Sequence, residues 1–221
     1  MLRVFMDEDR PMPRRPTLLL ALPSALLLAL VALHWSPLLA MDEGIARTTH
    51  RWAVRERGVT QTVRVLTDWV WDPVTMRLLC AGVAVWLGWR RAAWGTAVWL
   101  LVTCAVAAMV QQAVKAGVAR PRPVWPDPVD SARFAAFPSG HAMTATVVCG
   151  LLLWLVRESG VRGPRWYGAV VLAVVSVLGV GLTRVWLGVH WFSDVLGGWL
   201  FGALVVAVAV RVHERRSRVR P

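Results

Sequence analysis

The sequence predicts an all-α, polytopic membrane protein, namely a bundle of six transmembrane helices with an amphipathic segment in the first outer loop. Hydrophobic residues make up 57% of the 221 residues, whereas an ordinary soluble domain has roughly 45 to 50%. They gather in six runs, each near the ~20 residues that cross ~30 Å of hydrocarbon. Most of the basic residues, whose excess gives a net charge of +12, lie between the runs and near the termini. This distribution fits membrane topology and excludes the one-sided basic face of a nucleic-acid-binding protein.

The first two segments are predicted to be a membrane span and a surface segment. A polar tail over residues 1–16 precedes an apolar run over residues 17–40. That run has the outline of a signal peptide, but it is long, and the bulky Leu38 is a poor match to a cleavage site at Ala40. We therefore expect an uncleaved span. Residues 41–72 interleave Arg with Trp, Val and Leu, a pattern typical of an amphipathic segment on the outer surface.

Five further runs complete the predicted bundle, and the first of them is short. They cover residues 74–89, 92–110, 139–156, 167–183 and 188–210. A loop rich in Pro, Arg and Asp is expected at residues 111–138. The cysteines all fall inside apolar runs, and we interpret them as small buried hydrophobic residues. His50 and His213 are interpreted as solvated side chains.

The predicted spans also set the domain boundaries and the orientation. One membrane domain is expected over residues 17–210, between tails over residues 1–16 and 211–221. Six spans place both tails on one side of the membrane. That side carries 14 of the 25 basic residues, and this excess predicts that it is cytoplasmic. The first outer loop is itself rich in Arg, which narrows the difference in the number of basic residues between the two sides.

Three polar clusters fall together on the outer side of the predicted bundle, at residues 115–123, 137–141 and 183–194. Lys115, Arg122 and Arg184 supply three cations without a matching set of acids. Such a group repels itself unless it binds an anion, and phosphate suits the forked donors of Arg and the point charge of Lys. Ser139 and Gly140 stand where a helix is expected to begin, so free backbone N–H groups and the helix dipole face the same anion. Gly140 also lets a ligand approach the backbone closely.

The last cluster contains a histidine and an aspartate in an otherwise apolar stretch. His190 and Asp194 are four residues apart, which on a helix places them on one face within hydrogen-bonding reach. Taken alone, the pair is equally compatible with two side chains that merely satisfy each other. Phosphoryl transfer needs a nucleophile and an acid for the leaving oxygen. His190, held by Asp194, suits the nucleophile, and His141 suits the acid.

The three clusters together resemble the three-part signature of the type 2 phosphatidic acid phosphatases. This family is the membrane branch of a superfamily that includes bacterial acid phosphatases and vanadium haloperoxidases. The resemblance covers about 80 residues, and the six predicted spans are similar to those of the membrane branch. Thr183 stands where the family usually has Ser and keeps the hydroxyl. The matching residues are Lys115-x6-Arg122-Pro123, Pro138-Ser139-Gly140-His141 and Thr183-Arg184-x5-His190-x3-Asp194.

The resemblance implies a role for each matching residue. His190 would form a phosphohistidine intermediate, Asp194 would orient it, and His141 would protonate the departing group. The family works without a metal, and Asp127 and Asp130 near the motifs do not form a convincing Mg²⁺ site, so we expect no cofactor. Thr183 would make a minor contact, and the residues that would hold the phosphate are Lys115, Arg122, Ser139, Gly140 and Arg184.

The resemblance therefore predicts a metal-independent hydrolase of a lipid phosphate or pyrophosphate at the outer face of the plasma membrane. Candidate substrates are undecaprenyl pyrophosphate, phosphatidic acid and phosphatidylglycerol phosphate, which the motifs do not separate because they contact only the phosphate. A soluble phosphate ester also stays open as substrate. Two other functions stay open, a transferase that passes the phosphoryl group to another lipid or sugar and a non-catalytic membrane protein that binds phosphorylated lipid. The use of Arg for all basic residues except Lys115 suggests a bacterium with a GC-rich genome.

Overall fold

The computed structural model describes residues 15–219, with side chains described over residues 17–216, and this part of the chain is helical without any strand. Most of the predicted tail 1–16 lies outside the described residues. The last helix continues to Val219, so no break marks the start of the predicted tail 211–221. The elements are α1 (Arg15–Ala32), α2 (Ser36–Arg55), α3 (Arg57–Val65), η1 (Leu66–Val70), α4 (Pro73–Arg91), α5 (Trp94–Val118), α6 (Gly140–Glu158), α7 (Pro164–Trp186) and α8 (Phe192–Val219).

Most of these helices are long and apolar enough to cross a membrane. Within the described residues there are five such candidate spans, the first of which joins α3, η1 and α4. A sixth is present if α1 and α2, which meet at 87°, are taken as one broken span. The predicted all-α membrane fold is thereby confirmed. The five spans are Arg57–Arg91, Trp94–Val118, Gly140–Glu158, Pro164–Trp186 and Phe192–Arg216.

The chain turns sharply inside the run that was predicted as the first span. α1 ends at Ala32, and His34 in the connection has a left-handed backbone with φ of 54°. Pro37 then lies in the first turn of α2, where its fixed φ and missing N–H favour a helix start. The prediction of one span over residues 17–40 is wrong in its end point, because apolar composition alone does not show where a helix bends.

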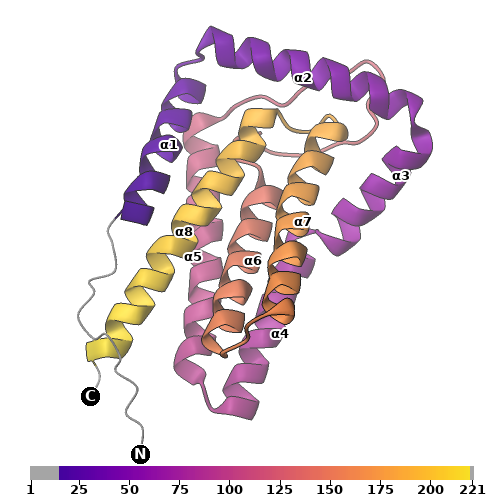
Figure 1. Ribbon diagram of the computed structural model, residues 1–221. Coiled ribbons are helices and arrows are strands. Elements are labelled where there is room, and N and C mark those ends of the chain that lie inside the picture. Colours follow the sequence, from indigo (N-terminus) through magenta and orange to yellow (C-terminus); the bar gives the residue numbers. More distant parts are fainter. Residues whose placement is uncertain (1–14, 220–221) are drawn as a thin grey trace, which may run out of the picture.

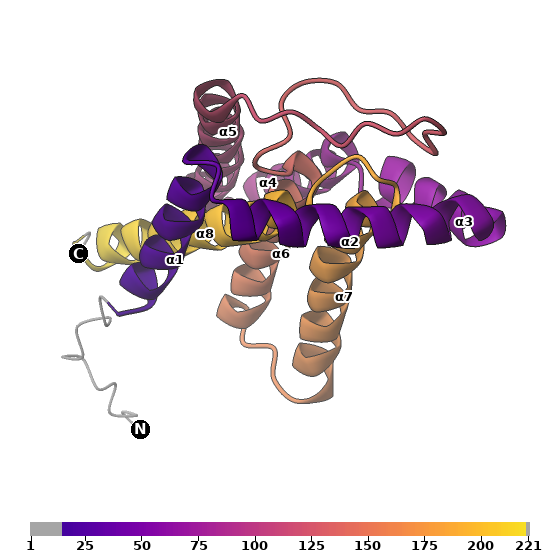
Figure 2. The ribbon, with the colours of Figure 1, turned by 90° about the horizontal axis from the view of Figure 1, so that it is seen from above.

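α2 lies across one end of the bundle, and α3 leads from it back toward α4 (Figures 1 and 2). The described ends of α1 and α8 that lead to the two termini lie toward the opposite end of the bundle (Figure 1). One stripe of α2 is buried, whereas Arg47 and Arg51 are exposed. This confirms the predicted amphipathic character of the segment. The buried residues recur every three or four positions and are Leu38, Asp42, Ala46, His50 and Ala53.

α6 lies within the bundle, and α8 packs directly against it (Figure 1). Gly198 and Gly202 of α8 make this approach possible. An added Cβ would lie 2.7 Å from the carbonyl oxygen of Ser139 at the first position and 3.0 Å from that of Met143 at the second. The small residues therefore bring the two backbones together. As a result the first turns of α6 and α8 meet, and the Ser139 N–H donates to the Asp194 carbonyl oxygen at 2.9 Å.

Two helix boundaries differ from the predicted ones at places that matter for the site. α5 continues to Val118, so Lys115 lies in the last turn of a helix and not in a loop. α8 begins only at Phe192, so His190 lies in the turn between α7 and α8. The loop between α5 and α6 therefore covers residues 119–139, and it lies at the same end of the bundle as α2 (Figure 1).

Candidate active site

A cavity of about 510 Å³ opens at the end of the bundle where α2 and the loop 119–139 lie. Its wall is made by α4, α5, α6, α7, the loop and the turn before α8. Three of the nine residues singled out in the sequence, Ser139, Thr183 and Asp194, are buried behind this wall. The other six line the cavity together: Lys115, Arg122, Gly140, His141, Arg184 and His190.

His190 and Asp194 are in contact, as predicted, but not because they share a helical face. His190 precedes α8, whereas Asp194 lies in the first turn of that helix. The Asp194 Oδ2 atom accepts the backbone N–H of Trp191 at 2.9 Å, which closes the start of α8 as in a capping box. The same oxygen lies 3.2 Å from Nδ1 of His190. The aspartate thus caps its own helix and holds the imidazole at the same time.

The second nitrogen of His190 faces the cations of the cavity. Its Nε2 lies 3.0 Å from Nη1 of Arg122. Because a guanidinium carries only donors, Nε2 must accept this hydrogen bond. The ring proton is then on Nδ1, which donates to Asp194. This tautomer leaves the lone pair of Nε2 on the cavity side, where a nucleophile needs it.

The surroundings of His190 also keep the imidazole uncharged. The side chain is buried, and the cations of Arg122, Arg184 and Lys115 lie nearby. Burial, reinforced by these cations, holds the pKa of His190 well below its ordinary value. An uncharged imidazole with an unprotonated Nε2 is the form that attacks phosphorus, once Arg122 moves its hydrogen bond from this nitrogen to the phosphate.

Two of the cations are held by carbonyl oxygens of the loop and not by carboxylates. Lys115 donates from Nζ to the carbonyl oxygen of Ala135. Arg122 donates from Nε to Phe134 at 2.9 Å and from Nη2 to Arg133 at 3.1 Å. Carbonyl oxygens orient a cation without neutralising it, so both positive charges remain available to an anion in the cavity.

Arg184 has a different environment, which corrects the expectation that the three cations lack matching acids. Its Nη1 lies 3.6 Å from a carboxylate oxygen of Asp130 and 3.7 Å from one of Asp68. Asp68 belongs to η1, a segment expected on the outer surface, and Asp130 belongs to the loop. Within residues 17–216 the buried Nε of Arg184 has no hydrogen-bond partner. The charge of Arg184 is therefore partly balanced, while one of its donors is still unused.

The start of α6 supplies the remaining predicted residues. His141 and Gly140 line the cavity, but the Ser139 hydroxyl is buried without a partner in the described part of the chain. An added Cβ at Gly140 would lie 2.8 Å from Nε2 of Gln111, so the glycine makes room for an amide of α5. Thr183 donates its hydroxyl to the Val180 carbonyl oxygen at 2.7 Å, within its own helix.

A buried polar network behind His190 was not expected from the sequence. Arg120 donates from Nη1 to Oδ1 of Asp194 at 2.7 Å and from Nη2 to Oδ2 of Asp42 at 2.8 Å. Asp42, from α2, also accepts the backbone N–H of Ser193 in the first turn of α8 at 2.9 Å. The motif spacing selects Arg122, which has the six-residue gap from Lys115, and therefore does not single out Arg120. The feature that could have indicated this network is the position of Asp42 on the buried stripe of α2.

The loop 119–139 is fixed to the helices by Trp125. Its ring stacks on His50 of α2, with centroids 4.1 Å apart, and its Nε1 donates to the Gly188 carbonyl oxygen at 2.9 Å. Gly188 has a φ of 66°, and an added Cβ would lie 2.6 Å from the indole nitrogen. His50 donates to Asp127 at 2.9 Å, and this bond holds the pKa of Asp127 below its usual range. The expectation that His50 is solvated is therefore wrong, because the loop covers it.

The fold and the site together define a membrane-embedded phosphatase. An uncharged histidine is held by an aspartate at the wall of a cationic cavity, in a bundle of apolar helices. The chain belongs to the PAP2 superfamily, whose family model matches residues 96–218. The family resemblance found in the motifs is thereby confirmed. Among the described residues, no group of three or more His, Cys, Asp or Glu side chains is arranged to hold a metal ion.

Several characterised proteins are similar to this chain. Phosphatidylglycerophosphatase B of Bacillus subtilis is 26% identical over 195 residues, which cover 88% of this chain and 94% of that protein. A decaprenylphosphoryl-5-phosphoribose phosphatase of Mycobacterium tuberculosis is 32% identical over 167 residues, 74% of this chain and 85% of the relative. An undecaprenyl-diphosphatase of Sulfolobus acidocaldarius is 27% identical over 156 residues, 66% of this chain and 65% of the relative.

A solved structure has the same fold. It is the crystal structure of a transmembrane PAP2-type phosphatidylglycerolphosphate phosphatase from Bacillus subtilis. The two chains superpose with a TM-score of 0.80 at 24% sequence identity, over 92% of this chain and 98% of the other. The helical architecture, including the arrangement of α1 to α8, is thus that of a known membrane phosphatase.

Proposed function

We propose that this protein hydrolyses the phosphate monoester or diphosphate of a membrane lipid through a phosphohistidine on His190, at the outer face of the plasma membrane. The observation that carries the proposal is the state of His190. Its Nδ1 is engaged by Asp194 at 3.2 Å, and its Nε2 lies next to Arg122 at the wall of the cavity. An imidazole prepared in this way is a nucleophile for phosphoryl transfer.

The reaction follows from the groups around the cavity. The Nε2 lone pair attacks phosphorus while Lys115, Arg122 and Arg184 stabilise the negative charge on the equatorial oxygens. His141, at the start of α6, gives a proton to the leaving oxygen and then takes one from the water that hydrolyses the phosphohistidine. Arg122 already donates to Nε2, so the same guanidinium is in place to bind a phosphate that approaches this nitrogen.

Three features support the orientation of the protein in the membrane. The cavity lies at the end of the bundle with α2, and the described ends that lead to both termini point to the other end (Figure 1). Most basic residues outside the site belong to the tails and turns of that other end, which favours a cytoplasmic location for it. We therefore assign residues 17–210 to the membrane domain and residues 1–16 and 211–221 to cytoplasmic tails of a bacterial plasma-membrane protein.

The substrate class follows from the relatives and from the position of the cavity. The names of three relatives refer to a phosphatidylglycerophosphate, an undecaprenyl diphosphate and a decaprenylphosphoryl-5-phosphoribose. All three are lipids that carry phosphate. The cavity opens at one end of a bundle of membrane-spanning helices, a position that suits the phosphate of a lipid in the bilayer.

Phosphate release by purified protein tests the proposal. In detergent and in the presence of EDTA, the wild-type chain should release inorganic phosphate from lipid phosphates. His190→Ala should abolish this activity, because no other group in the cavity replaces Nε2 as nucleophile. His34→Asn is the matched control, since His34 is exposed and its left-handed backbone tolerates Asn.

The outcomes separate the competing functions. Phosphate release that survives His190→Ala would refute the mechanism. A phosphohistidine that forms but gives free phosphate only slowly, and faster transfer to an added lipid or sugar, would identify a transferase. Absence of a phosphohistidine in base-quenched wild-type protein, together with phospholipid binding and no phosphate release, would identify a non-catalytic binding protein.

A further inference from the structure

Arg77 is a cation of the cavity that no motif includes. It lies in α4 in the apolar stretch 74–80, inside a membrane span, and it lines the wall of the cavity. Within residues 17–216 its only hydrogen bond is from Nη2 to Oγ1 of Thr144 at 3.3 Å, and no carboxylate oxygen lies within 4.0 Å of it. A membrane-embedded charge without an ion partner is costly and points to a function.

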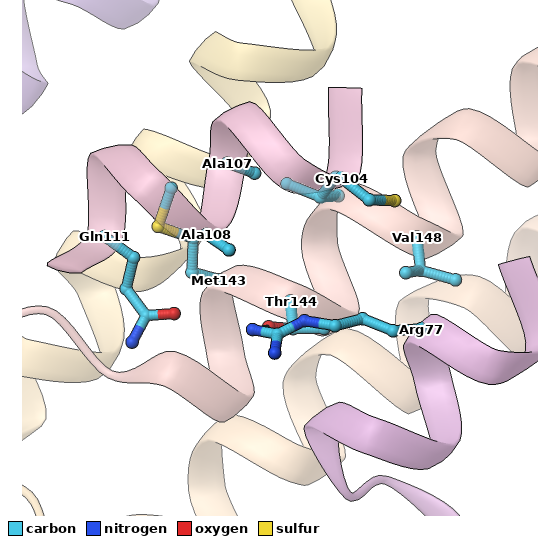
Figure 3. A pocket seen from close by; sticks show the side chains of 9 residues that line it. Arg77, Cys104, Ala107, Ala108, Gln111, Met143, Thr144 and Val148 are labelled. Carbon is cyan, nitrogen blue, oxygen red and sulfur yellow. Dashed lines mark hydrogen bonds between the residues drawn. The ribbon is translucent and has the colours of Figure 1, made fainter. Parts of the chain in front are cut away.

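Gln111 of α5 is a second polar group without a partner at the same place. The residue is only 6% exposed, and within the described side chains its amide makes no hydrogen bond. Arg77 and Gln111 line both the large cavity and a small pocket of about 10 Å³ beneath it, which has room for no more than about one water molecule. Figure 3 shows the guanidinium extending from α4 toward Thr144 and the amide of Gln111 pointing into the same pocket. Both side chains line the cavity, so their unused N–H donors are available to a polar ligand that enters it.

The position of the pair relates it to the leaving group. Thr144, the partner of Arg77, follows His141 by three residues on α6, so the two lie on one face of that helix. His190 approaches from a different part of the wall, the turn between α7 and α8. In an in-line displacement the leaving oxygen lies opposite the nucleophile, next to the group that protonates it. Arg77 and Gln111 therefore lie on the side of His141, where the leaving group departs.

The charge of Arg77 indicates which leaving group fits there. A lipid monophosphate loses an alcohol, which is uncharged after it is protonated and does not require a cation. A lipid diphosphate loses a lipid monophosphate, which carries negative charge. Arg184 is partly balanced by Asp68 and Asp130, whereas Arg77 has no acid beside it. A second, separate cation matches a second phosphate.

We propose that Arg77 and Gln111 form a subsite for the second phosphate of a lipid diphosphate, which makes diphosphates the preferred substrate class; this rests on the proposed function. Nε2 of His190 attacks the terminal phosphorus, and the bond from that phosphorus to the bridging oxygen breaks. The electron pair stays on the bridging oxygen, which takes the proton of His141. Arg77 binds the departing lipid monophosphate, and water then converts the phosphohistidine to inorganic phosphate.

The test compares two substrates that differ by one phosphate. A polyprenyl diphosphate and the monophosphate of the same chain length are offered in the same detergent, and kcat/KM is measured from phosphate release. Arg77→Gln should lower kcat/KM about 10- to 100-fold for the diphosphate, as expected for a lost charge-assisted hydrogen bond, and much less for the monophosphate. Arg77→Lys should restore most of the kcat/KM for the diphosphate that Arg77→Gln loses. Arg90→Gln removes an exposed cation from the other end of the same helix and should change neither value.

An inhibition measurement on the wild-type protein does not depend on any variant. Methylenediphosphonate should inhibit at lower concentration than methylphosphonate, and equal inhibition would overturn the subsite. A fall in kcat/KM of Arg77→Gln that is equal for both lipids would also overturn it while the proposed function stands. If the wild-type protein releases phosphate from neither lipid, the proposed function itself fails.

Discussion

Arg120 provides the sharpest test of how the fold supports the nucleophile. Its guanidinium is 6% exposed and joins two carboxylates that are fully buried, Asp42 of α2 and Asp194 of α8. Arg120→Gln removes the cation and leaves both carboxylates without their charged partner. Breaking a buried pair in this way costs about 3 to 5 kcal/mol, so the free energy of unfolding should fall by about that amount.

The same substitution should reduce catalysis through the position of His190. Without Arg120, Oδ1 of Asp194 loses a hydrogen bond of 2.7 Å, and the carboxylate is held only by the cap of α8 and the imidazole. A misplacement of the nucleophile by ~1 Å can cost about 100-fold, so we expect kcat to fall about 10- to 100-fold. KM should change less, because Arg120 does not line the cavity.

Unfolding in detergent and phosphate release measure the two effects on one protein sample. Asp42→Asn should be destabilising alone but should cost less in the Arg120→Gln background, because the two residues act as a pair. Arg51→Gln, which removes an exposed cation from α2, is the control with the same change in charge. Wild-type stability and wild-type kcat in both Arg120→Gln and Asp42→Asn would refute the reasoning.

Two further predictions concern the nucleophile and the helix contact behind it. The pKa of His190 is depressed by burial and nearby cations, so Nε2 stays unprotonated above that pKa, and the acidic limb of kcat/KM that belongs to His190 should lie well below pH 6.5. In Arg122→Gln a neighbouring cation is lost and this acidic limb should move to higher pH; an unmoved limb would contradict the role of the charge. Gly198→Ala adds a Cβ 2.7 Å from the Ser139 carbonyl oxygen and should destabilise the protein by about 1 to 3 kcal/mol, whereas Gly44→Ala, where the space is open, should not.

The residues that line the cavity could largely be predicted, because their chemistry is unusual in an apolar chain. Lys115, His141 and His190 lie in three separate stretches, yet the predicted topology already placed all three at one end of the bundle. A charged or titratable group is costly there unless it has a role. Spacing and charge were therefore sufficient for these positions, even though the predicted ends of α5 and α8 were wrong by several residues.

The acids beside Arg184 and the buried polar network behind His190 could not be predicted in the same way. Asp68 lies in a segment whose periodicity indicated a surface helix, and nothing in that pattern shows that η1 turns inward beside Arg184. Arg120 and Arg122 are both followed by Pro, and only packing shows that one is buried on Asp194 while the other lines the cavity. The sequence shows Arg77 as a charged residue in an apolar run, but it does not show that this face of the helix is turned toward the cavity. Such assignments depend on tertiary contacts between distant segments.

Asp42 has a consequence for how much of the chain the active site needs. The family model matches residues 96–218, and this stretch contains every motif residue. Asp42 lies outside it, yet its carboxylate accepts the N–H of Ser193 and binds Arg120. A chain that begins after α2 would keep the motifs but leave the first turn of α8 without its external cap and Arg120 without one of its two anions. We therefore expect full activity to require the N-terminal segment packed on the bundle, so that the shortest functional unit extends beyond the stretch that carries the motifs.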